Sequence, residues 1–233
     1  FLLFRFIYQQ KKIFDMRQTD ATSLGTPTLD AVTANLLRDI KSMTEAEVLR
    51  IVSPDLDYKI YGEPIIKSLE NAYKRKVDIK IITGPIVLVD EKENNGILDL
   101  LERDKVKIYR EDTRPALPYR ILGKRELYVE NPYTILTPKN EITELPSEDF
   151  AVSSVPFNKE DPHFWTLKMM GDFEMIIKQA KPTKDRNDFI LLSYSQVGKL
   201  IERIASETKS PNDYDDATAI LDYMPMKKIK NYL

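Results

Sequence analysis

Short strand-like runs alternate with helix-length amphipathic segments over the first half of the chain, and this alternation restricts the fold more than any other feature. Apolar residues recur at helical spacing from Thr28 to Met43 and from Gly62 to Lys74. The run Val77–Thr83 alternates between apolar and polar residues as far as Ile81 and ends at Gly84-Pro85, which predicts a strand. Helix-length spacers between strands imply parallel pairing with right-handed crossovers. The sequence therefore predicts an α/β fold.

The second half changes character, because short apolar-polar runs follow one another there with only turns between them. This spacing is typical of an antiparallel meander, so the predicted sheet is mixed but mainly parallel, with helices flanking it. The remaining predicted strands are Glu47–Ser53, Lys105–Tyr109, Arg120–Leu122, Glu126–Glu130, Tyr133–Thr137 and Ala151–Val155. The remaining predicted helices are Ile97–Arg103, a long one from Glu160 or Asp161 to Ala180, Phe189–Ser206 and Asp213–Tyr223.

The chain has 233 residues, which suits one large domain or one medium domain with appendages. We expect an N-terminal segment and linker over residues 1–27, an α/β domain over 28–182 and a C-terminal helical extension over 183–233. No internal repeat is evident, so the two halves do not read as duplicated domains.

The first residues form an apolar and aromatic segment, Phe1–Tyr8, which Arg5 interrupts and Lys11-Lys12 follows. A membrane-spanning helix needs about 20 apolar residues, so we predict no transmembrane span. The segment is read as a dimerisation or docking element. Two alternatives are a membrane-surface anchor with a basic flank, and an artefact of the chain boundaries, since the first methionine is Met16.

Composition removes several classes of site. The chain has no cysteine, which excludes disulfides, thiolate nucleophiles and Cys-ligated metals, and agrees with a cytoplasmic setting. Its one histidine, His163, makes a His-rich metal site impossible within one chain. No glycine-rich nucleotide motif occurs, so no cofactor and no metal are predicted. The formal net charge of −2 offers no global attraction to nucleic acid.

Four segments carry a resemblance to a known family. They are "RKVDIKIITGP" at 75–85, "LLERDKVKIY" at 100–109, "RPALPYRILGKRELYVENPY" at 114–133 and "FWTLKMMGDFEMIIKQAKP" at 164–182. Their order resembles one half of the phospholipase D superfamily over about Thr28–Pro182, closest in pattern to archaeal members such as the effector domain of TrmB-type transcription regulators. The resemblance implies a phospholipase D-like sheet and a homodimer.

The catalytic signature of that superfamily, H-x-K-(x)4-D, is degenerate here. Tyr119 stands where the resemblance places the His nucleophile, Ile121 where it places the Lys and Glu126 where it places the Asp. A phenol with an ordinary pKa of about 10 is a poor substitute for imidazole at neutral pH. Counting the signature from His163 instead fails at both other positions. We therefore predict no catalytic residue of this type.

A polar cluster remains around the degenerate signature, and we predict that it lines a ligand site. An arginine guanidinium donates paired hydrogen bonds to a carboxylate or phosphate, and a carboxylate accepts hydrogen bonds from hydroxyl groups, which suits a small hydroxylated or anionic ligand. The alternative is an ordinary solvated strand face. The candidate ligand-binding residues are Arg114, Tyr119, Arg120, Lys124 and Glu126.

The function expected from the sequence is a non-catalytic phospholipase D-like module that senses a ligand or acts in regulation or assembly, with transcription regulation as its setting. DNA would be contacted only through a missing region or a partner, because no helix-turn-helix signature is evident. Two alternatives stay open: a divergent phosphodiesterase or nuclease, and a structural domain whose tail from Phe189 to Tyr223 binds a partner.

Overall fold

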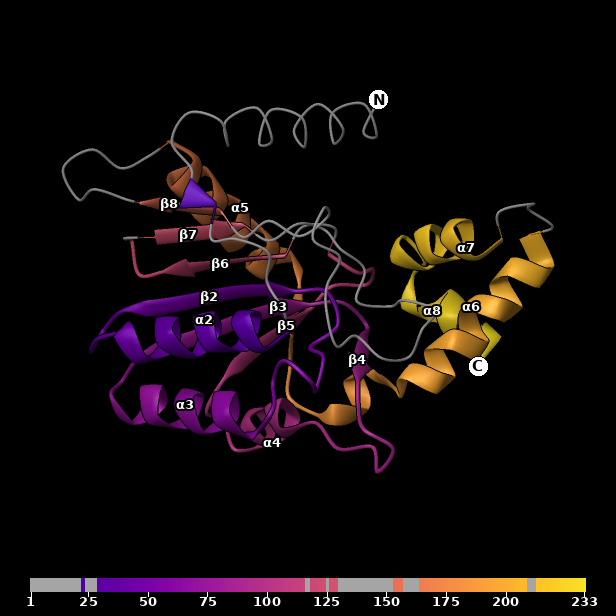
Figure 1. Ribbon diagram of the computed structural model, residues 1–233, viewed down its shortest axis with the longest axis horizontal. Helices are drawn as coiled ribbons and strands as arrows, with labels where there is room; N and C mark the ends of the chain where they lie inside the picture. The colour runs from indigo at the N-terminus through magenta and orange to yellow at the C-terminus, as the bar shows by residue number, and fades with distance from the viewer. Residues whose placement is uncertain are drawn as a thin grey trace.

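A computed structural model describes residues 22–23, 29–115, 118–124, 126–129, 153–156, 164–208 and 213–233. Its centre is a mixed sheet with helices on both faces (Figure 1), in the strand order β1-β8-β7-β6-β2-β3-β5-β9. The predicted α/β class with a mixed, helix-flanked sheet is confirmed. The strands of this sheet are β1 Thr22–Ser23, β2 Val48–Ser53, β3 Asp78–Thr83, β5 Lys107–Arg110, β6 Tyr119–Leu122, β7 Glu126–Val129, β8 Ser153–Pro156 and β9 Lys181–Thr183.

The parallel part of the sheet consists of β2, β3 and β5, as the helix-length spacers predict. Helix α3 (Glu63–Lys74) connects β2 to β3, and α4 (Gly96–Glu102) precedes β5. Both helices begin where the sequence favours a start: Gly62 precedes α3 with a proline in its first turn, and the side chain of Asn95 accepts a hydrogen bond from Ile97 N at 3.1 Å. The crossovers therefore bring the carboxyl ends of the three strands to one edge of the sheet.

The other part of the sheet is antiparallel. Strand β6 pairs with β2, with Tyr119 opposite Val52, and β6, β7 and β8 then follow one another as a meander. This arrangement confirms the predicted mixed sheet. Among the described strands of this sheet, however, β2 with β3 and β3 with β5 pair in parallel and the other pairs are antiparallel, so the expectation of a mainly parallel sheet is wrong. The strand predicted at Tyr133–Thr137 lies outside the described residues.

Alternating side chains give the sheet two different faces. Leu49 and Ile51 of β2 point toward α2 (Leu29–Ser42), α3 and α4 and belong to the larger hydrophobic cluster. Val52 belongs to a smaller cluster on the opposite face, which α5 (Phe164–Gln179) covers with the fully buried Phe173. Any two neighbouring residues of one strand therefore lie in different surroundings.

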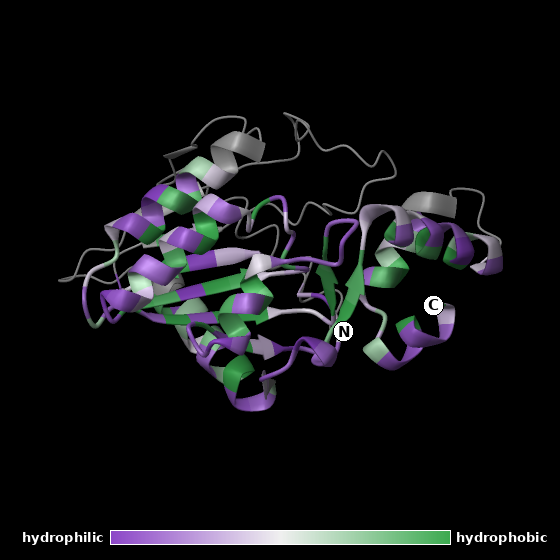
Figure 2. Ribbon diagram, turned by 90° about the horizontal axis from the view of Figure 1, so that it is seen from below, coloured by the Kyte–Doolittle hydropathy of each residue, from purple (hydrophilic) through white to green (hydrophobic). Residues whose placement is uncertain are grey.

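The C-terminal helices attach to the sheet through a second, two-stranded sheet. Strand β10 (Ile190–Leu192) pairs in parallel with β4 (Ile86–Leu88), which follows β3. Figure 2 shows hydrophobic strands at this junction, and both strands contribute side chains to a third hydrophobic cluster. The helices of this part are the single turn η1 (Arg186–Asp188), α6 (Tyr194–Thr208), α7 (Asp213–Asp222) and α8 (Met226–Tyr232).

The helix predicted over Phe189–Ser206 is wrong at its start, because residues 190–192 form β10. Helix α6 begins only after a reciprocal cap, in which Ser193 N donates to Gln196 Oε1 at 2.7 Å and Gln196 N donates to Ser193 Oγ at 3.3 Å. The apolar run before Ser193 is equally compatible with helix and strand, and pairing with β4 makes it a strand.

The predicted boundary between residues 182 and 183 falls inside β9, which pairs with β5. The expected N-terminal segment Phe1–Tyr8 lies outside the described residues. Within the described part of the chain, no helix is long and apolar enough to cross a membrane.

Candidate functional site

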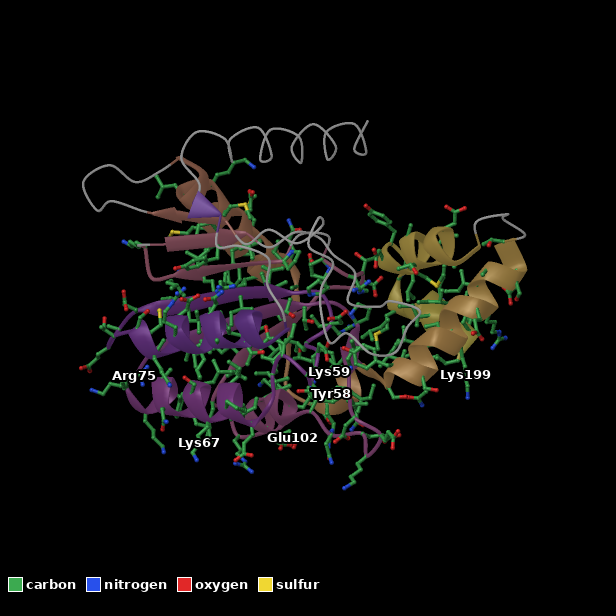
Figure 3. The ribbon with its side chains drawn as sticks, in the orientation of Figure 1. Tyr58, Lys59, Lys67, Arg75, Glu102 and Lys199 are labelled. Atoms are coloured by element: carbon green, nitrogen blue, oxygen red, sulfur yellow. The ribbon has the colours of Figure 1, made fainter. Side chains whose placement is uncertain are left out.

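The carboxyl ends of β2, β3 and β5 meet at one edge of the sheet, where open α/β sheets hold their ligands. Polar residues follow β2 and β5 there, whereas Gly84 follows β3. The C-terminal helices pack against the same edge. Figure 3 shows Tyr58 and Lys59 at this junction, just beyond β2. We refer to this region as the carboxyl edge.

Arg114 lies at the centre of the carboxyl edge and is buried. Its Nη2 donates to Asp55 Oδ2 at 2.8 Å, and its Nη1 donates to Asp222 Oδ1 at the end of α7. Burial raises the pKa of both carboxyl groups. The positive charge of Arg114 lowers each pKa, but by less than burial raises it. The guanidinium thus links the end of β2 to the C-terminal helices.

Gly84 allows the backbones of Arg114 and Pro54 to lie close to the end of β3, because a Cβ at residue 84 would lie 2.8 Å from Arg114 Cα and 2.8 Å from Pro54 O. The first residue after β3 therefore packs directly against the backbone of Arg114, and any larger residue would push the two apart.

A second carboxyl group, Asp57, is buried two residues beyond Asp55. It accepts hydrogen bonds from the Tyr194 hydroxyl of α6 and from Lys59 N, the latter at 2.9 Å. Burial, and then repulsion from Asp55, raise the pKa of Asp57 to about 6. The same burial raises the pKa of Tyr194, so its phenol stays protonated and donates. Asp57 is therefore a second polar link between the sheet and the C-terminal helices.

Tyr119 begins β6 on the face that α5 covers. Its ring packs edge-on against Phe173, with ring centroids 6.4 Å apart. Its hydroxyl is buried and has no hydrogen-bond partner among the described residues. Burial raises the pKa of Tyr119, and the carboxylates of Asp172 and Glu111 add to the effect. The phenol is therefore neutral at physiological pH.

Arg120 follows Tyr119 and so points to the opposite face of the sheet. Its Nε donates to Asp39 Oδ2 of α2 at 2.8 Å, and its guanidinium carbon lies 4.5 Å from the centroid of the Tyr128 ring. Both members of this ion pair are 2% exposed. Arg120 joins a helix to the sheet and does not face the carboxyl edge.

The five predicted ligand residues therefore do not form one cluster. Tyr119 lies under α5, Arg120 under α2 and Arg114 at the carboxyl edge, while Lys124 is exposed in the turn after β6 and Glu126 begins β7 opposite Leu122. Strand alternation separates Tyr119 from Arg120, and their closeness in sequence hides this. Ligand binding by these residues stays a prediction.

Sequence reasoning missed the polar residues that do meet at the carboxyl edge. They are Asp55, Asp57, Glu111, Tyr194 and Asp222. One signal was available: Asp55 and Asp57 directly follow a buried strand and Pro54, the position at which α/β sheets place their functional groups. Asp222 and Tyr194 carry no such local signal.

A cavity of about 330 Å³ opens at the carboxyl edge between the end of β5 and the end of α5. Glu111, the first residue after β5, is half-buried there, and burial raises the pKa of its carboxyl group. The described residues that line the cavity are Arg110, Glu111, Asp112, Gln179 and Ala180. Within the described residues, no group of His, Asp or Glu side chains has an arrangement that could hold a metal ion.

No family model matches this chain, and no curated protein does either. Among solved structures, it is similar to TrmBL2, an archaeal chromatin protein, with 12% identity and a TM-score of 0.47 over 78% of this chain and 64% of that one. It is similar to Nuc, a phospholipase D family member from Salmonella typhimurium, with 13% identity and a TM-score of 0.47 over 71% of this chain and all of Nuc. A third similar structure is polyphosphate kinase from Porphyromonas gingivalis, with 14% identity and a TM-score of 0.44 over 83% of this chain.

The chain spans 64% of TrmBL2 and 32% of the kinase. These identities and scores do not assign the chain to a family, and function depends on the site rather than on the fold.

Proposed function

We propose that this chain is a non-catalytic, phospholipase D-like module that senses a small ligand in a regulatory or assembly role. The observation that supports this most is the ion-paired carboxyl edge. Arg114 is bonded to both Asp55 and Asp222, so the buried guanidinium is already engaged within the chain and ties the C-terminal helices to the sheet. A phosphoryl-transfer site would keep such a cation available for the transferred phosphate.

The surroundings of Tyr119 support the same proposal. Phosphoryl transfer of the phospholipase D type needs a nucleophile that can lose its proton near neutral pH. Burial raises the pKa of Tyr119 above its ordinary value, and Ile121, two residues on, is fully buried on the same face. An apolar side chain there offers no charge to a phosphate oxygen.

Ligand sensing requires an accessible site, and the cavity beside Glu111 is the best candidate at the carboxyl edge. Of the residues that the sequence singles out, Tyr119 is close enough to Glu111 for the carboxylate to influence its pKa. Lys124 is exposed elsewhere, in the turn after β6. The proposed ligand site is therefore centred on Glu111 and not on the signature window.

We include a homodimer, a cytoplasmic setting and an archaeal regulatory context in the proposal, on the strength of the resemblance to TrmB-type regulators. The solved TrmBL2 structure is described as showing a mode of DNA binding. For the present chain, with its net charge of −2, we assign DNA contact to a further region or a partner.

The test is a hydrolysis assay with bis(4-nitrophenyl) phosphate and with single-stranded DNA, each with and without Mg²⁺. We expect no turnover above buffer. Turnover that Tyr119→Phe abolishes would contradict the proposal and favour the divergent phosphodiesterase. Light scattering coupled to size exclusion tests the homodimer, and a mass of one chain at all concentrations would reject it.

A further inference from the structure

We propose that the cavity beside Glu111 binds a small organic cation, namely a primary amine. The inference rests on the proposed sensing function and names the chemical class of its ligand. The cavity has a volume of about 330 Å³, which lies within the range of about 300–1,000 Å³ that is usual for small-molecule sites.

The sign of the charge around the cavity favours a cation. Of the described side chains that line it, two are carboxylates, Glu111 and Asp112, and one is a cation, Arg110. The Arg110 side chain is directed toward α8, where its Nη1 contacts Met226 Sδ at 2.7 Å. Gln179 is the last residue of α5, so the negative end of that helix dipole faces the same space.

Among the side chains that the structure describes, none gives Glu111 a counter-charge. Its carboxyl group is half-buried, and no hydrogen bond or ion pair with a described residue offsets the loss of water around it. An ammonium group in the cavity would supply both a charge and up to three N–H donors to Glu111 and to the side-chain oxygen of Gln179. The nearby Tyr119 hydroxyl also lacks a described partner.

The remainder of the carboxyl edge disfavours an anion. Three carboxylates, Asp55, Asp57 and Asp222, lie there with two cations, Arg114 and Lys59. Two of these carboxylates already share the guanidinium of Arg114. A carboxylate or phosphate ligand would add to an existing excess of negative charge. The sequence suggests a hydroxylated or anionic ligand, but for this cavity we infer a cationic one.

The experiment uses the full chain and three probes of equal length. Isothermal titration calorimetry compares 1,4-diaminobutane, 1,4-butanediol and succinate, which differ in charge and not in carbon skeleton. We expect the diamine to bind about 10- to 100-fold more tightly than the diol, because charge-assisted hydrogen bonds replace neutral ones. Succinate is expected to bind more weakly still.

Two variants place the binding at the cavity. Glu111→Gln preserves shape and removes the charge, and we expect it to weaken diamine binding by about 10- to 100-fold. Gln179→Lys puts an ammonium group at the end of α5, where the helix dipole favours it, and should block the diamine. The matched control is Glu102→Gln, an exposed carboxylate on α4 (Figure 3), which should leave binding unchanged.

The outcomes separate the inference from the function on which it rests. Glu111-dependent binding of the diol or of succinate in preference to the diamine would overturn the cationic class and leave ligand sensing in place. Equal diamine binding by the wild-type chain and Glu111→Gln, or no diamine binding at all, would overturn the site. Hydrolysis of a phosphodiester by the same preparation would instead overturn the proposed function.

Discussion

Arg120 of β6 and Asp39 of α2 form a buried ion pair, in which Arg120 Nε and Nη2 each lie 2.8 Å from Asp39 Oδ2. Both side chains are 2% exposed, so neither charge has water as an alternative partner. The pair joins the first described helix to the middle of the sheet. A residue that the sequence suggests for ligand binding thus holds two elements of the fold together.

Replacement of Arg120 tests this structural role. Arg120→Met should lower the free energy of unfolding by about 3–5 kcal/mol, because Asp39 would be buried without its main counter-charge. The double variant Arg120→Met with Asp39→Leu should recover most of the loss. Urea denaturation measures both, and Lys124→Met, at an exposed position, serves as the control. A single variant as stable as the control would refute the role.

The two buried tyrosines of the site should respond differently to loss of their hydroxyl groups. Tyr119→Phe should leave stability unchanged or raise it by about 1 kcal/mol, since the hydroxyl has no described partner. Tyr194→Phe should cost about 1.5–3 kcal/mol, because its hydroxyl donates to the carboxylate of Asp57. Thermal and urea denaturation compare the pair, and equal losses would contradict the assignment.

Two glycines form a second matched pair. Gly84→Ala should destabilise the chain by about 1–3 kcal/mol, because its Cβ would lie 2.8 Å from Arg114 Cα. Gly198→Ala in α6, where a Cβ meets nothing within 4 Å, should stabilise it by about 0.5–1 kcal/mol. Urea denaturation checks the opposite signs, and a harmless Gly84→Ala would show that the backbone of Arg114 moves freely.

Asp57 should make stability depend on pH. Its pKa in the folded chain is about 6, above the ordinary value of about 3.9, so the folded state holds this proton more tightly than the unfolded state does. The resulting stability is fully present below about pH 4 and is lost as the pH rises through 6, a change of about 3 kcal/mol.

Asp57→Asn should therefore flatten the stability profile between pH 4 and pH 7 relative to the wild type. Urea midpoints across this range measure the difference between the two profiles, which removes the contributions of other titrating groups. Glu102→Gln is the exposed control. Parallel profiles for Asp57→Asn and wild type would show that Asp57 titrates normally.

Elements with a clear period were predictable from local sequence. The alternating run in Val77–Thr83 corresponds to β3. The apolar stripe of Gly62–Lys74 corresponds to α3, with Ile65, Leu69 and Ala72 buried. The short apolar run before Ser193 was not predictable in this way, because without a period it suits either state. Its pairing with β4, about a hundred residues away, made it a strand.

For the site too, one part of its chemistry can be predicted from local sequence and another part cannot. Loss of the His and Lys of the signature can be read directly from Tyr119 and Ile121, because it depends only on which residues stand there. The partners of those residues cannot be read in this way. One-residue alternation sends Tyr119 and Arg120 to opposite faces of the sheet, and Arg114 meets Asp55 and Asp222 across 59 and 108 residues. Residue identity sets what a side chain is able to do, whereas chain crossovers and strand pairing set which side chains meet, because those contacts join segments that no local pattern connects.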